Sequence, residues 1–277
     1  MSNSYQKKTS VFRQLHQGPS ILVLPNAWDV ASAKIFSALG FPAIGTTSSG
    51  IANCLGYADG ENISLDEMLF MIERIAKAVD LPVTADIEAG YTDDPEKLSR
   101  SIASVIGLGV VGINLEDSSA SDELVEVDLQ TEKLRAVRDA ASAVAAELFI
   151  NARVDVYLFG VGDREQRFRN TIDRAHAYKE AGADCIFIPG VVDAQLIESL
   201  VKNISGPINI LAVSNTPPVG VLEELGVARV SLGSGPARAC ATLARRIGRE
   251  LLAQGSYSSF TQDAMTYEEM NSLFRKR

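Results

Sequence analysis

The stretch "VTADIEAGY" (residues 83–91) begins like a buried β-strand and ends with two acids, Asp86 and Glu88. Side chains alternate along a strand, so both carboxylates are expected on the same side of it. Short apolar runs of this kind recur along the chain, and segments of helical period lie between them. The eight runs are ILVL (21–24), AIGTT (43–47), VTADIE (83–88), VGINLED (111–117), LFINARVD (148–155), CIFIPG (185–190), INILAV (208–213) and RVSLG (229–233).

This alternation predicts the fold class, an α/β protein built as a (β/α)8 TIM barrel. Several helix candidates end at a Gly that suits a C-cap. Helices are expected within residues 30–40, 64–79, 94–109, 164–182 and 193–203. Eight strands, each followed by a helix, typically take about 250 residues. The chain has 277 residues and no linker-like tract, so we expect a single domain, 1–277.

Two further helices are expected after the last strand, over residues 235–253 and 266–274. They are surplus to the barrel and carry apolar side chains. Because an exposed apolar surface of this kind often marks a protein contact, we expect a homo-oligomer, a dimer or a tetramer. The extra C-terminal helical segment would be exchanged between its subunits.

The composition excludes several classes of function. The chain is 46% hydrophobic and 22% charged, as expected of a globular protein with a substantial core. A net charge of −9 argues against nucleic-acid binding. No apolar stretch reaches the roughly 18 residues of a membrane helix, and the polar start shows no signal-peptide pattern, so a cytoplasmic protein is expected. The three cysteines form no CxxC spacing, so neither disulfides nor zinc are indicated.

Polar side chains gather at the ends of the third, fourth and fifth predicted strands, at the end of a barrel where active sites are built. They are Asp86 with Glu88, Asn114 with Glu116, and Asn151 with Arg153 and Asp155. Converging carboxylates repel unless a cation lies among them. Oxygen ligands without Cys or His nearby favour Mg²⁺ or Mn²⁺ over zinc. The alternative interpretation is that these acids pair with arginines in a polar layer of the barrel.

Four motifs occur in order on successive strand ends: LPNAWDVASAKIFSALGFPAIGTTSSGIANCLGYADGE (24–61), VTADIEAGY (83–91), GINLED (112–117) and INARVD (150–155). With them the chain resembles the isocitrate lyase/phosphoenolpyruvate mutase superfamily over nearly its whole length. The resemblance implies a (β/α)8 barrel, commonly a tetramer with an exchanged C-terminal helix. It also implies chemistry that makes or breaks a C–C or P–C bond next to a 2-oxo acid, through an enolate-like state held on Mg²⁺.

The resemblance further implies residue roles. Asp86 would be the direct metal ligand, while Asp59, Glu88 and Glu116 would hold the metal mostly through its waters. Arg153 would face the developing negative charge and, with Glu116 and Asp59, make up the catalytic set. The expected substrate contacts are Asn114, Arg153, Tyr91 and, around the substrate carboxylate, Thr47, Ser48 and Ser49.

The chain departs from the family where substrates are selected. Isocitrate and methylisocitrate lyases carry a Lys-Lys/Arg-Cys-Gly-His motif after the fourth strand, but residues 117–127 here (DSSASDELVEV) contain no Lys, Cys or His. Phosphonate-handling members add a Lys and an Asn from that loop and a His near the end of the sixth strand, where this chain has Pro189. Glu88 stands where the family usually has Asp. A carboxylate substrate is therefore favoured.

Other features are weaker. His16 precedes the barrel and His176 lies within a predicted helix, so neither is placed for proton transfer. The segment LGSGPAR (232–238) puts a Gly-rich turn before a helix N-terminus, which can hold an anion. That turn supports a different hypothesis, a barrel that binds a phosphorylated metabolite, which we rank lower because such a site needs no carboxylate cluster.

The predicted function is a Mg²⁺-dependent lyase or decarboxylase of a small 2-oxo carboxylate, with oxaloacetate the first candidate, acting through an enolate. Decarboxylation needs no dedicated base, and the sequence offers no obvious one. One alternative is a phosphoenolpyruvate or carboxyphosphonoenolpyruvate phosphonomutase, or a phosphonopyruvate hydrolase. The second alternative is a non-catalytic protein that binds 2-oxo acids.

Overall fold

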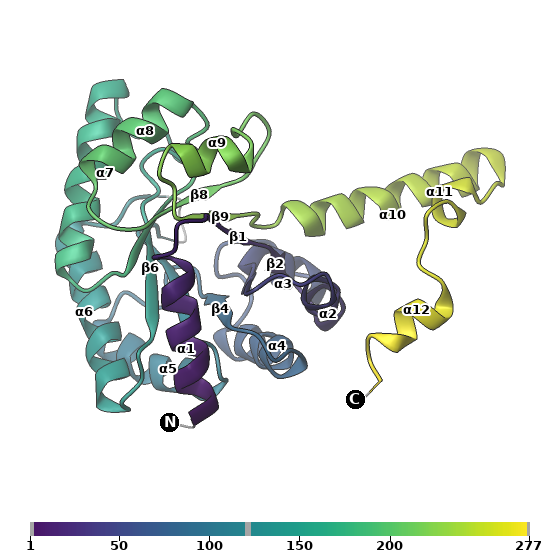
Figure 1. The fold of residues 1–277 in the computed structure, drawn as a ribbon, viewed down its shortest axis with the longest axis horizontal. Coiled ribbons are helices and arrows are strands. Elements are labelled where there is room, and N and C mark those ends of the chain that lie inside the picture. The colour runs from purple at the N-terminus through teal and green to yellow at the C-terminus, as the bar shows by residue number, and fades with distance from the viewer. Residues whose placement is uncertain (1–2, 120–122, 276–277) are drawn as a thin grey trace.

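The protein folds as an α/β barrel (Figure 1). The structure is a computed structural model that describes residues 3–119 and 123–275. Nine parallel strands form one sheet. The strands are β1 (Leu22–Leu24), β2 (Asn26–Ala27), β3 (Ile44–Thr46), β4 (Val83–Asp86), β5 (Gly112–Glu116), β6 (Phe149–Arg153), β7 (Cys185–Ile188), β8 (Ile208–Leu211) and β9 (Arg229–Ser231).

The first predicted run (21–24) forms β1, and the ninth strand is β2, which follows just beyond that run. Pro25, which has no backbone N–H, separates β1 from β2. Strand β1 pairs with β9 and β2 pairs with β3, so this bent segment brings the two edges of the sheet together. The expected (β/α)8 barrel is therefore confirmed.

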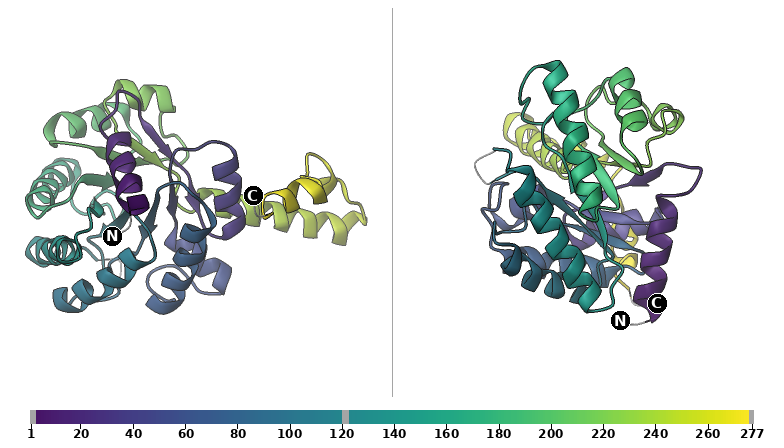
Figure 2. Two further views of the ribbon diagram at one scale, coloured as in Figure 1. Left: turned by 60° about the horizontal axis from the view of Figure 1, so that its bottom comes forward. Right: turned by 90° about the vertical axis from the view of Figure 1, so that its left-hand side faces the viewer.

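Helices follow the strands and surround the sheet (Figure 2). They are α1 (Asn3–Leu15), α2 (Val30–Ala38), α3 (Ser48–Leu55), α4 (Leu65–Ala78), α5 (Pro95–Gly107), α6 (Val127–Ala143), α7 (Arg164–Glu180), α8 (Ala194–Asn203) and α9 (Val219–Glu224). All five helices expected from periodicity form. Each of these five begins after a side chain that accepts a main-chain N–H, which satisfies part of the open first turn. The caps are Asp29, Ser64, Asp94, Asp163 and Asp193.

The sheet is apolar outside and polar inside. Its outward isoleucines are fully buried beneath the helices: Ile113, Ile150, Ile186 and Ile210. The inward positions of the same region carry polar side chains that are also buried: Asn114, Asn151, Asn209 and Arg229. Hydrophobic burial therefore holds helices to sheet, while the barrel interior is reserved for polar contacts.

Helix α1 and His16, just after it, close the N-terminal end of the barrel. Phe12 packs edge-on against Phe149, the first residue of β6, with ring centroids 5.2 Å apart. His16 stacks on the same ring at 4.2 Å. All three side chains are buried. The barrel is therefore sealed at the end opposite the carboxylates, and His16 lies far from them, as expected.

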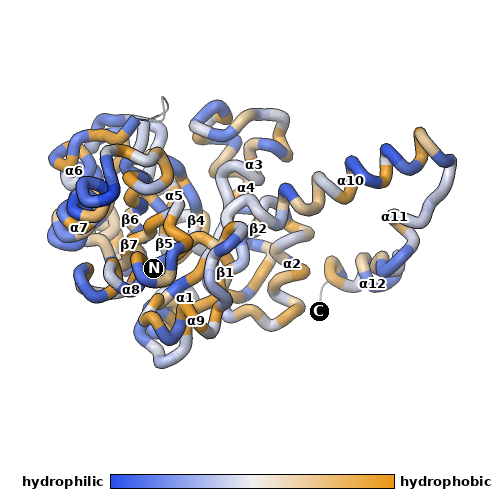
Figure 3. The backbone as a smooth tube through the Cα atoms, turned by 90° about the horizontal axis from the view of Figure 1, so that it is seen from above, coloured by the Kyte–Doolittle hydropathy of each residue, from blue (hydrophilic) through white to orange (hydrophobic). Residues whose placement is uncertain are grey.

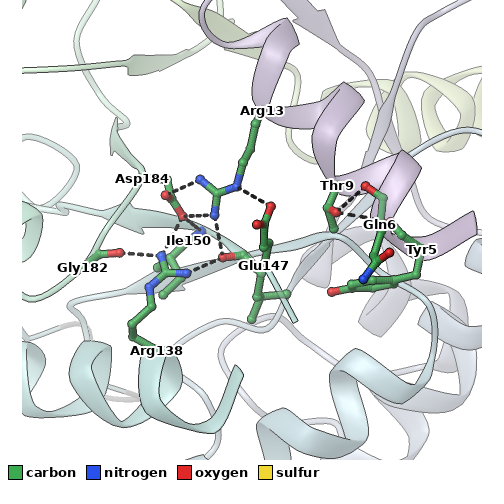
Figure 4. Close-up of polar contacts among 10 residues, drawn as sticks. Tyr5, Gln6, Thr9, Arg13, Arg138, Glu147, Ile150, Gly182 and Asp184 are labelled. Atoms are coloured by element: carbon green, nitrogen blue, oxygen red, sulfur yellow. Dashed lines mark hydrogen bonds and ion pairs between the residues drawn. The ribbon is translucent and has the colours of Figure 1, made fainter. Parts of the chain in front are cut away.

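Ion pairs fasten α1 to this end of the barrel (Figure 4). Asp184, just before β7, accepts hydrogen bonds from Arg13 of α1 at 2.6 Å and from Arg138 of α6 at 2.7 Å. Its second oxygen also accepts the main-chain N–H of Ile150 at 2.8 Å. One partly buried carboxylate thus joins two helices to β6.

A C-terminal arm extends away from the barrel (Figures 1 and 2). It consists of α10 (Gly235–Gln254), α11 (Ser258–Thr261) and α12 (Tyr267–Ser272), which confirms both expected C-terminal helices. No residue of α10 is buried, and Leu252 is 93% exposed. Apolar positions recur along the arm (Figure 3). Among the described residues, no helix is long and apolar enough to cross a membrane.

Candidate active site

A polar cavity of about 280 Å³ opens at the carboxyl ends of β4, β5 and β6. It is lined by Ser48, Asp59, Gly60, Glu61, Glu88, Ala89, Glu116, Ser118, Ser119, Arg153, Leu158 and Phe159. Five of the residues predicted from the sequence are among them. The acids and the arginine therefore converge on one hollow at the end of the barrel where active sites are expected.

Asp86 ends β4 beside this cavity and is held by α3 and β3. The main-chain N–H and the hydroxyl of Ser48 donate to Asp86 Oδ2 at 3.3 and 3.0 Å. The N–H of Asp86 itself donates to Thr46 Oγ1 at 2.9 Å. Because Ser48 is the first residue of α3, the carboxylate also lies at the positive end of that helix. These hydrogen bonds fix the position of Asp86.

Glu88 is tied to the loop that carries Asp59, through Glu61, a residue not predicted from the sequence. Its Oε2 accepts the main-chain N–H of Glu61 at 2.6 Å, and its Oε1 accepts the Tyr91 hydroxyl at 3.0 Å. In return, Glu61 Oε1 accepts the main-chain N–H of Tyr91 at 2.7 Å. Glu61, Glu88 and Tyr91 all have positive φ angles, 57°, 53° and 62°. Such conformations are costly away from glycine, and they often accompany functional sites.

Arg153 lies between two acids at the end of β6. Its NH1 donates to Glu116 and its Nε to Asp155 Oδ1, the latter at 2.7 Å. Asp155 also accepts the Ser118 hydroxyl at 2.8 Å. The alternative interpretation of the sequence, acids paired with arginine, therefore describes Glu116 and Asp155. Burial alone would lower the pKa of Arg153, but these two carboxylates outweigh burial and raise it, so the guanidinium stays charged.

The acids of the cavity are hard to ionise together. Burial, with the charge of Asp86 adding to it, raises the pKa of Asp59 above its usual value and that of Glu88 to about 7. Burial likewise raises the pKa of Glu116 to about 8, although Arg153 opposes the shift. Mutual repulsion of this kind is relieved when a cation enters such a cluster.

The donor set fits a hydrated divalent cation. Within residues 3–119 and 123–275, no three His, Cys, Asp or Glu side chains come close enough to bind a metal ion directly. Mg²⁺ is commonly held by one or two carboxylates and keeps several waters. Asp86 could supply the direct contact, and Asp59, Glu88 and Glu116 could bind the waters around it. These oxygen donors also suit Mn²⁺.

Several predicted substrate contacts already have protein partners. Thr47 is buried and its hydroxyl caps α3 by accepting the N–H of Gly50 at 3.4 Å. The Ser49 hydroxyl bonds to Asp59, and the Tyr91 hydroxyl bonds to Glu88. Thr47, Ser49 and Tyr91 therefore lie near the cavity, but their hydroxyls already form hydrogen bonds with other groups of the protein. Their contacts with substrate stay predictions.

An apolar turn after β6 forms one wall of the cavity, and the sequence analysis missed it. Leu158 and Phe159 line the cavity from this turn. Gly190, after β7, lies directly against this turn. Only glycine fits at this position, because a Cβ atom would lie 2.9 Å from the Leu158 nitrogen. Gly190 also has a φ of +84°, a conformation suited to glycine. The wall therefore depends on a close approach of two loops.

Three other features singled out from the sequence are the loop 117–127, His176 and the Gly-rich turn at 232–238. Of the loop 117–127, residues 120–122 lie outside the described residues. His176 Nε2 donates to Asn203 O over 3.0 Å, and the residue lies outside the cavity as expected. The N–H groups of Leu232 and Gly233 in the Gly-rich turn both donate to Asn26 Oδ1, at 2.8 and 2.9 Å. Those two groups are therefore already occupied by protein.

Comparison with known sequences identifies the family to which the chain is similar. The sequence model of the phosphoenolpyruvate phosphomutase family matches residues 12–252. An uncharacterized protein of Mycobacterium tuberculosis is 37% identical over 267 residues, covering 94% of this chain and 98% of its own length. Oxaloacetate decarboxylase 2 of Pseudomonas fluorescens is 29% identical over 240 residues, covering 84% and 79%.

Solved structures share the fold. A protein of Burkholderia cenocepacia provisionally named a lyase/mutase is 33% identical, with a TM-score of 0.91 over 99% of this chain and 98% of its own. A second protein of that organism, provisionally named a phosphonomutase, is 40% identical, with a TM-score of 0.83 over 87% and 99%. Phosphonopyruvate hydrolase in complex with oxalate and Mg²⁺ has a TM-score of 0.83 at 22% identity, over 96% and 94%. The chain belongs to the phosphoenolpyruvate mutase family, within the isocitrate lyase/phosphoenolpyruvate mutase superfamily of lyases and mutases, and is an enzyme of that type.

Proposed function

We propose that the protein is a Mg²⁺-dependent lyase or decarboxylase that acts on a small 2-oxo carboxylate through an enolate, with decarboxylation of oxaloacetate the first candidate. The observation that carries the proposal is the placement of Asp86 beside a cavity that also holds Asp59, Glu88, Glu116 and Arg153. Oxaloacetate decarboxylase 2 is among the relatives of the chain, which supports the choice of substrate.

The chain's own residues would bind the common end of such substrates. The N-terminus of α3, with Ser48 and Ser49, offers N–H and hydroxyl donors and the positive end of a helix to the C1 carboxylate. Arg153 adds a guanidinium that stays charged to the lining of the same cavity. Bound Mg²⁺ would supply Lewis-acid polarisation of the 2-oxo group.

Decarboxylation then breaks the C3–C4 bond, and CO₂ leaves as a neutral molecule. The bonding electron pair delocalises into the 2-oxo group as an enolate, and a proton delivered to C3 from water gives pyruvate. Arg153 stabilises the negative charge as it develops, since a fixed cation in a partly buried site costs no reorganisation during the reaction. No protein base is required.

The environment at the apolar wall supports loss of CO₂. Among the described residues that line the cavity, Arg153 is the one cation, and it already pairs with Glu116 and Asp155. A distal carboxylate beside Leu158 and Phe159 would be poorly solvated and surrounded by acids. Conversion of that carboxylate to neutral CO₂ removes the unfavourable charge.

A phosphonate enzyme of the same superfamily is the second candidate. The matching family model and one solved relative carry the names phosphoenolpyruvate phosphomutase and phosphonomutase. A dianionic phosphonate needs more positive charge than the paired Arg153 offers, so we rank this function below decarboxylation. Consumption of phosphonopyruvate, with or without release of phosphate, would reverse that order.

The test is pyruvate formation from oxaloacetate with and without Mg²⁺, corrected for the reaction of the metal alone. Wild type, Asp86→Ala and the surface control Glu73→Ala are compared. We expect Mg²⁺-dependent turnover in wild type and control, and only the metal's background in Asp86→Ala. Full activity in Asp86→Ala would refute the metal assignment. Binding of oxalate with Mg²⁺, without turnover of any candidate substrate, would instead indicate a non-catalytic 2-oxo acid-binding protein.

A further inference from the structure

Arg229 crosses the inside of the barrel beneath the candidate active site. It is the first residue of β9 and is fully buried, and its NH2 lies 3.4 Å from Asn114 Oδ1 on β5. Strands β8, β7 and β6 separate β9 from β5 in the sheet, so the two strands face each other across the barrel. Asn114 is in register with Asp86 and precedes Glu116 by two positions. The guanidinium therefore reaches across the barrel interior to the level of Asp86, two positions before Glu116.

This charge has no obvious structural use. Among the described residues, neither Nε nor NH1 of Arg229 has a hydrogen-bond partner, and no carboxylate forms an ion pair with it. Arg174, another buried arginine, instead pairs with Asp117 at 3.0 Å. Burial lowers the pKa of Arg229 only to about 10, so it remains charged at neutral pH. An unpaired buried charge costs stability, which points to a role other than holding the fold together.

Arg229 determines which way the Asn114 amide faces. A guanidinium only donates hydrogen bonds, so the Asn114 atom next to it has to be the oxygen. Asn151 Nδ2 donates to the same oxygen at 2.8 Å. Both acceptor positions of Asn114 Oδ1 thus point to β6 and the barrel axis. Among the described residues, no hydrogen bond from Asn114 Nδ2 to protein is found, so this donor remains available to a ligand.

We propose that Arg229 is a positioning residue: it locks the Asn114 side chain so that its Nδ2 donates to the substrate oxygen that gains negative charge. The inference rests on the proposed function, because it requires a 2-oxo carboxylate in the cavity. Without Arg229, either face of the Asn114 amide can turn upward. A carbonyl oxygen would then repel the substrate oxygen that the amide nitrogen attracts.

The test is a double-mutant cycle on binding of oxalate in the presence of Mg²⁺, measured by titration calorimetry. The variants are Arg229→Met, Asn114→Ala and the double variant, with Cys185→Ala as a control. Cys185 is fully buried in register with Asn151 and lies near Arg229, but no hydrogen bond joins the two side chains. Its truncation therefore controls for looser packing around Arg229 while the guanidinium is kept. If Arg229→Met does not fold, Arg229→Gln takes its place, since Gln can donate or accept and imposes no orientation.

We expect Arg229→Met and Asn114→Ala each to weaken oxalate binding about tenfold or more, the loss of one hydrogen bond to a charged group. The double variant should bind no more weakly than Asn114→Ala, and Cys185→Ala should bind like wild type. Unchanged binding in Arg229→Met, or losses that multiply in the double variant, would overturn the proposal, because Arg229 would then not act through Asn114.

A ligand-free measurement separates this inference from the proposed function. The side-chain ¹⁵N–¹H resonances of Asn114, identified by their absence in Asn114→Ala, should move in Arg229→Met or Arg229→Gln and stay in place in Cys185→Ala. If wild type binds no oxalate with Mg²⁺ but these resonances move, the proposed function fails and the contact stands. Resonances that stay in place in the Arg229 variants overturn the positioning role whatever the ligand.

Discussion

The main-chain N–H of Glu61 donates to Glu88 Oε2 over 2.6 Å, while the Glu61 carboxylate accepts the N–H of Tyr91. The two loops that carry proposed metal contacts are therefore bound to each other in both directions. Asp59 lies two residues before Glu61, so the position of either loop sets that of the other.

Glu61→Ala should weaken Mg²⁺ binding and activity about tenfold. The main-chain N–H of Tyr91 loses its carboxylate acceptor, so the Tyr91 hydroxyl no longer holds Glu88 in a fixed orientation. Glu61→Gln keeps an oxygen that can accept the Tyr91 N–H and should recover most of the loss. Mg²⁺ titration and initial rates on the two variants check this. Equal defects in both would mean that the charge of Glu61, rather than the hydrogen bond, matters.

Gly190→Ala should lower kcat/KM about tenfold or more, since its Cβ would meet the Leu158 turn and displace the apolar wall. Gly160→Ala is the matched control. Gly160 also has a positive φ, +65°, but open space around its Cβ position. Both substitutions strain the backbone, but only the Cβ of Gly190→Ala would clash with the Leu158 turn. Kinetics that fall equally in both would argue against a role for the wall.

The stability of the protein should fall in acid through His16. Burial, followed by the charge of Arg229, lowers the pKa of His16 to about 3 from 6.5. The folded state thus binds fewer protons than the unfolded state between pH 6.5 and 3, so stability is present above 6.5 and is lost as the pH falls through this window. From pH 6.5 to 4 the loss should reach about 3 kcal/mol. Urea unfolding of wild type and His16→Phe across this range tests it. An undiminished acid slope in His16→Phe would assign the loss to other groups.

Glu88 should produce the opposite slope. Burial raises its folded pKa to about 7, so the folded state binds more protons than the unfolded state between pH 4.5 and 7. Its contribution therefore falls as the pH rises through this window. The difference in free energy of unfolding between wild type and Glu88→Gln should show this trend without metal, and saturating Mg²⁺ should reduce it. A difference that grows in favour of wild type as the pH rises, without metal, would contradict the assignment.

The C-terminal arm should mediate self-association. Its apolar residues, such as Leu252 and Tyr267, are more than four-fifths exposed at 93% and 86%, which is typical of a surface that another chain covers. Light scattering should give a mass of two or four chains of 29.7 kDa. Leu252→Glu should shift the population toward the monomer, and the neighbouring change Gln254→Glu should not. A monomeric wild type would refute the expected homo-oligomer.

The barrel and the acids could be predicted because they depend on local patterns. Apolar runs of period two mark the strands, and acids at their ends mark the catalytic face. Glu61 was missed because its role arises from a hydrogen bond between two loops 27 residues apart in the chain. The pairing of Glu116 with Arg153 was foreseen only as an alternative, since residue spacing alone does not reveal side-chain partners.

Arg229 shows a different limit of the sequence. It lies in the predicted strand RVSLG, where an arginine suggests an exposed strand end. Its burial depends on β9 lying opposite β5, a relationship between segments more than a hundred residues apart. Only closure of the sheet by the segment around Pro25 brings these two strands face to face.

The packing of Phe12, His16 and Phe149 blocks the N-terminal end of the barrel, so the cavity is open only at the carboxyl ends of the strands. Whatever enters at the carboxyl ends of the strands must leave there too. Release of two products is therefore expected to be ordered: the product nearer the opening leaves before the product bound deeper in the cavity. The product that is released last should inhibit competitively with respect to substrate. Product inhibition would therefore show which part of the substrate binds deepest in the cavity.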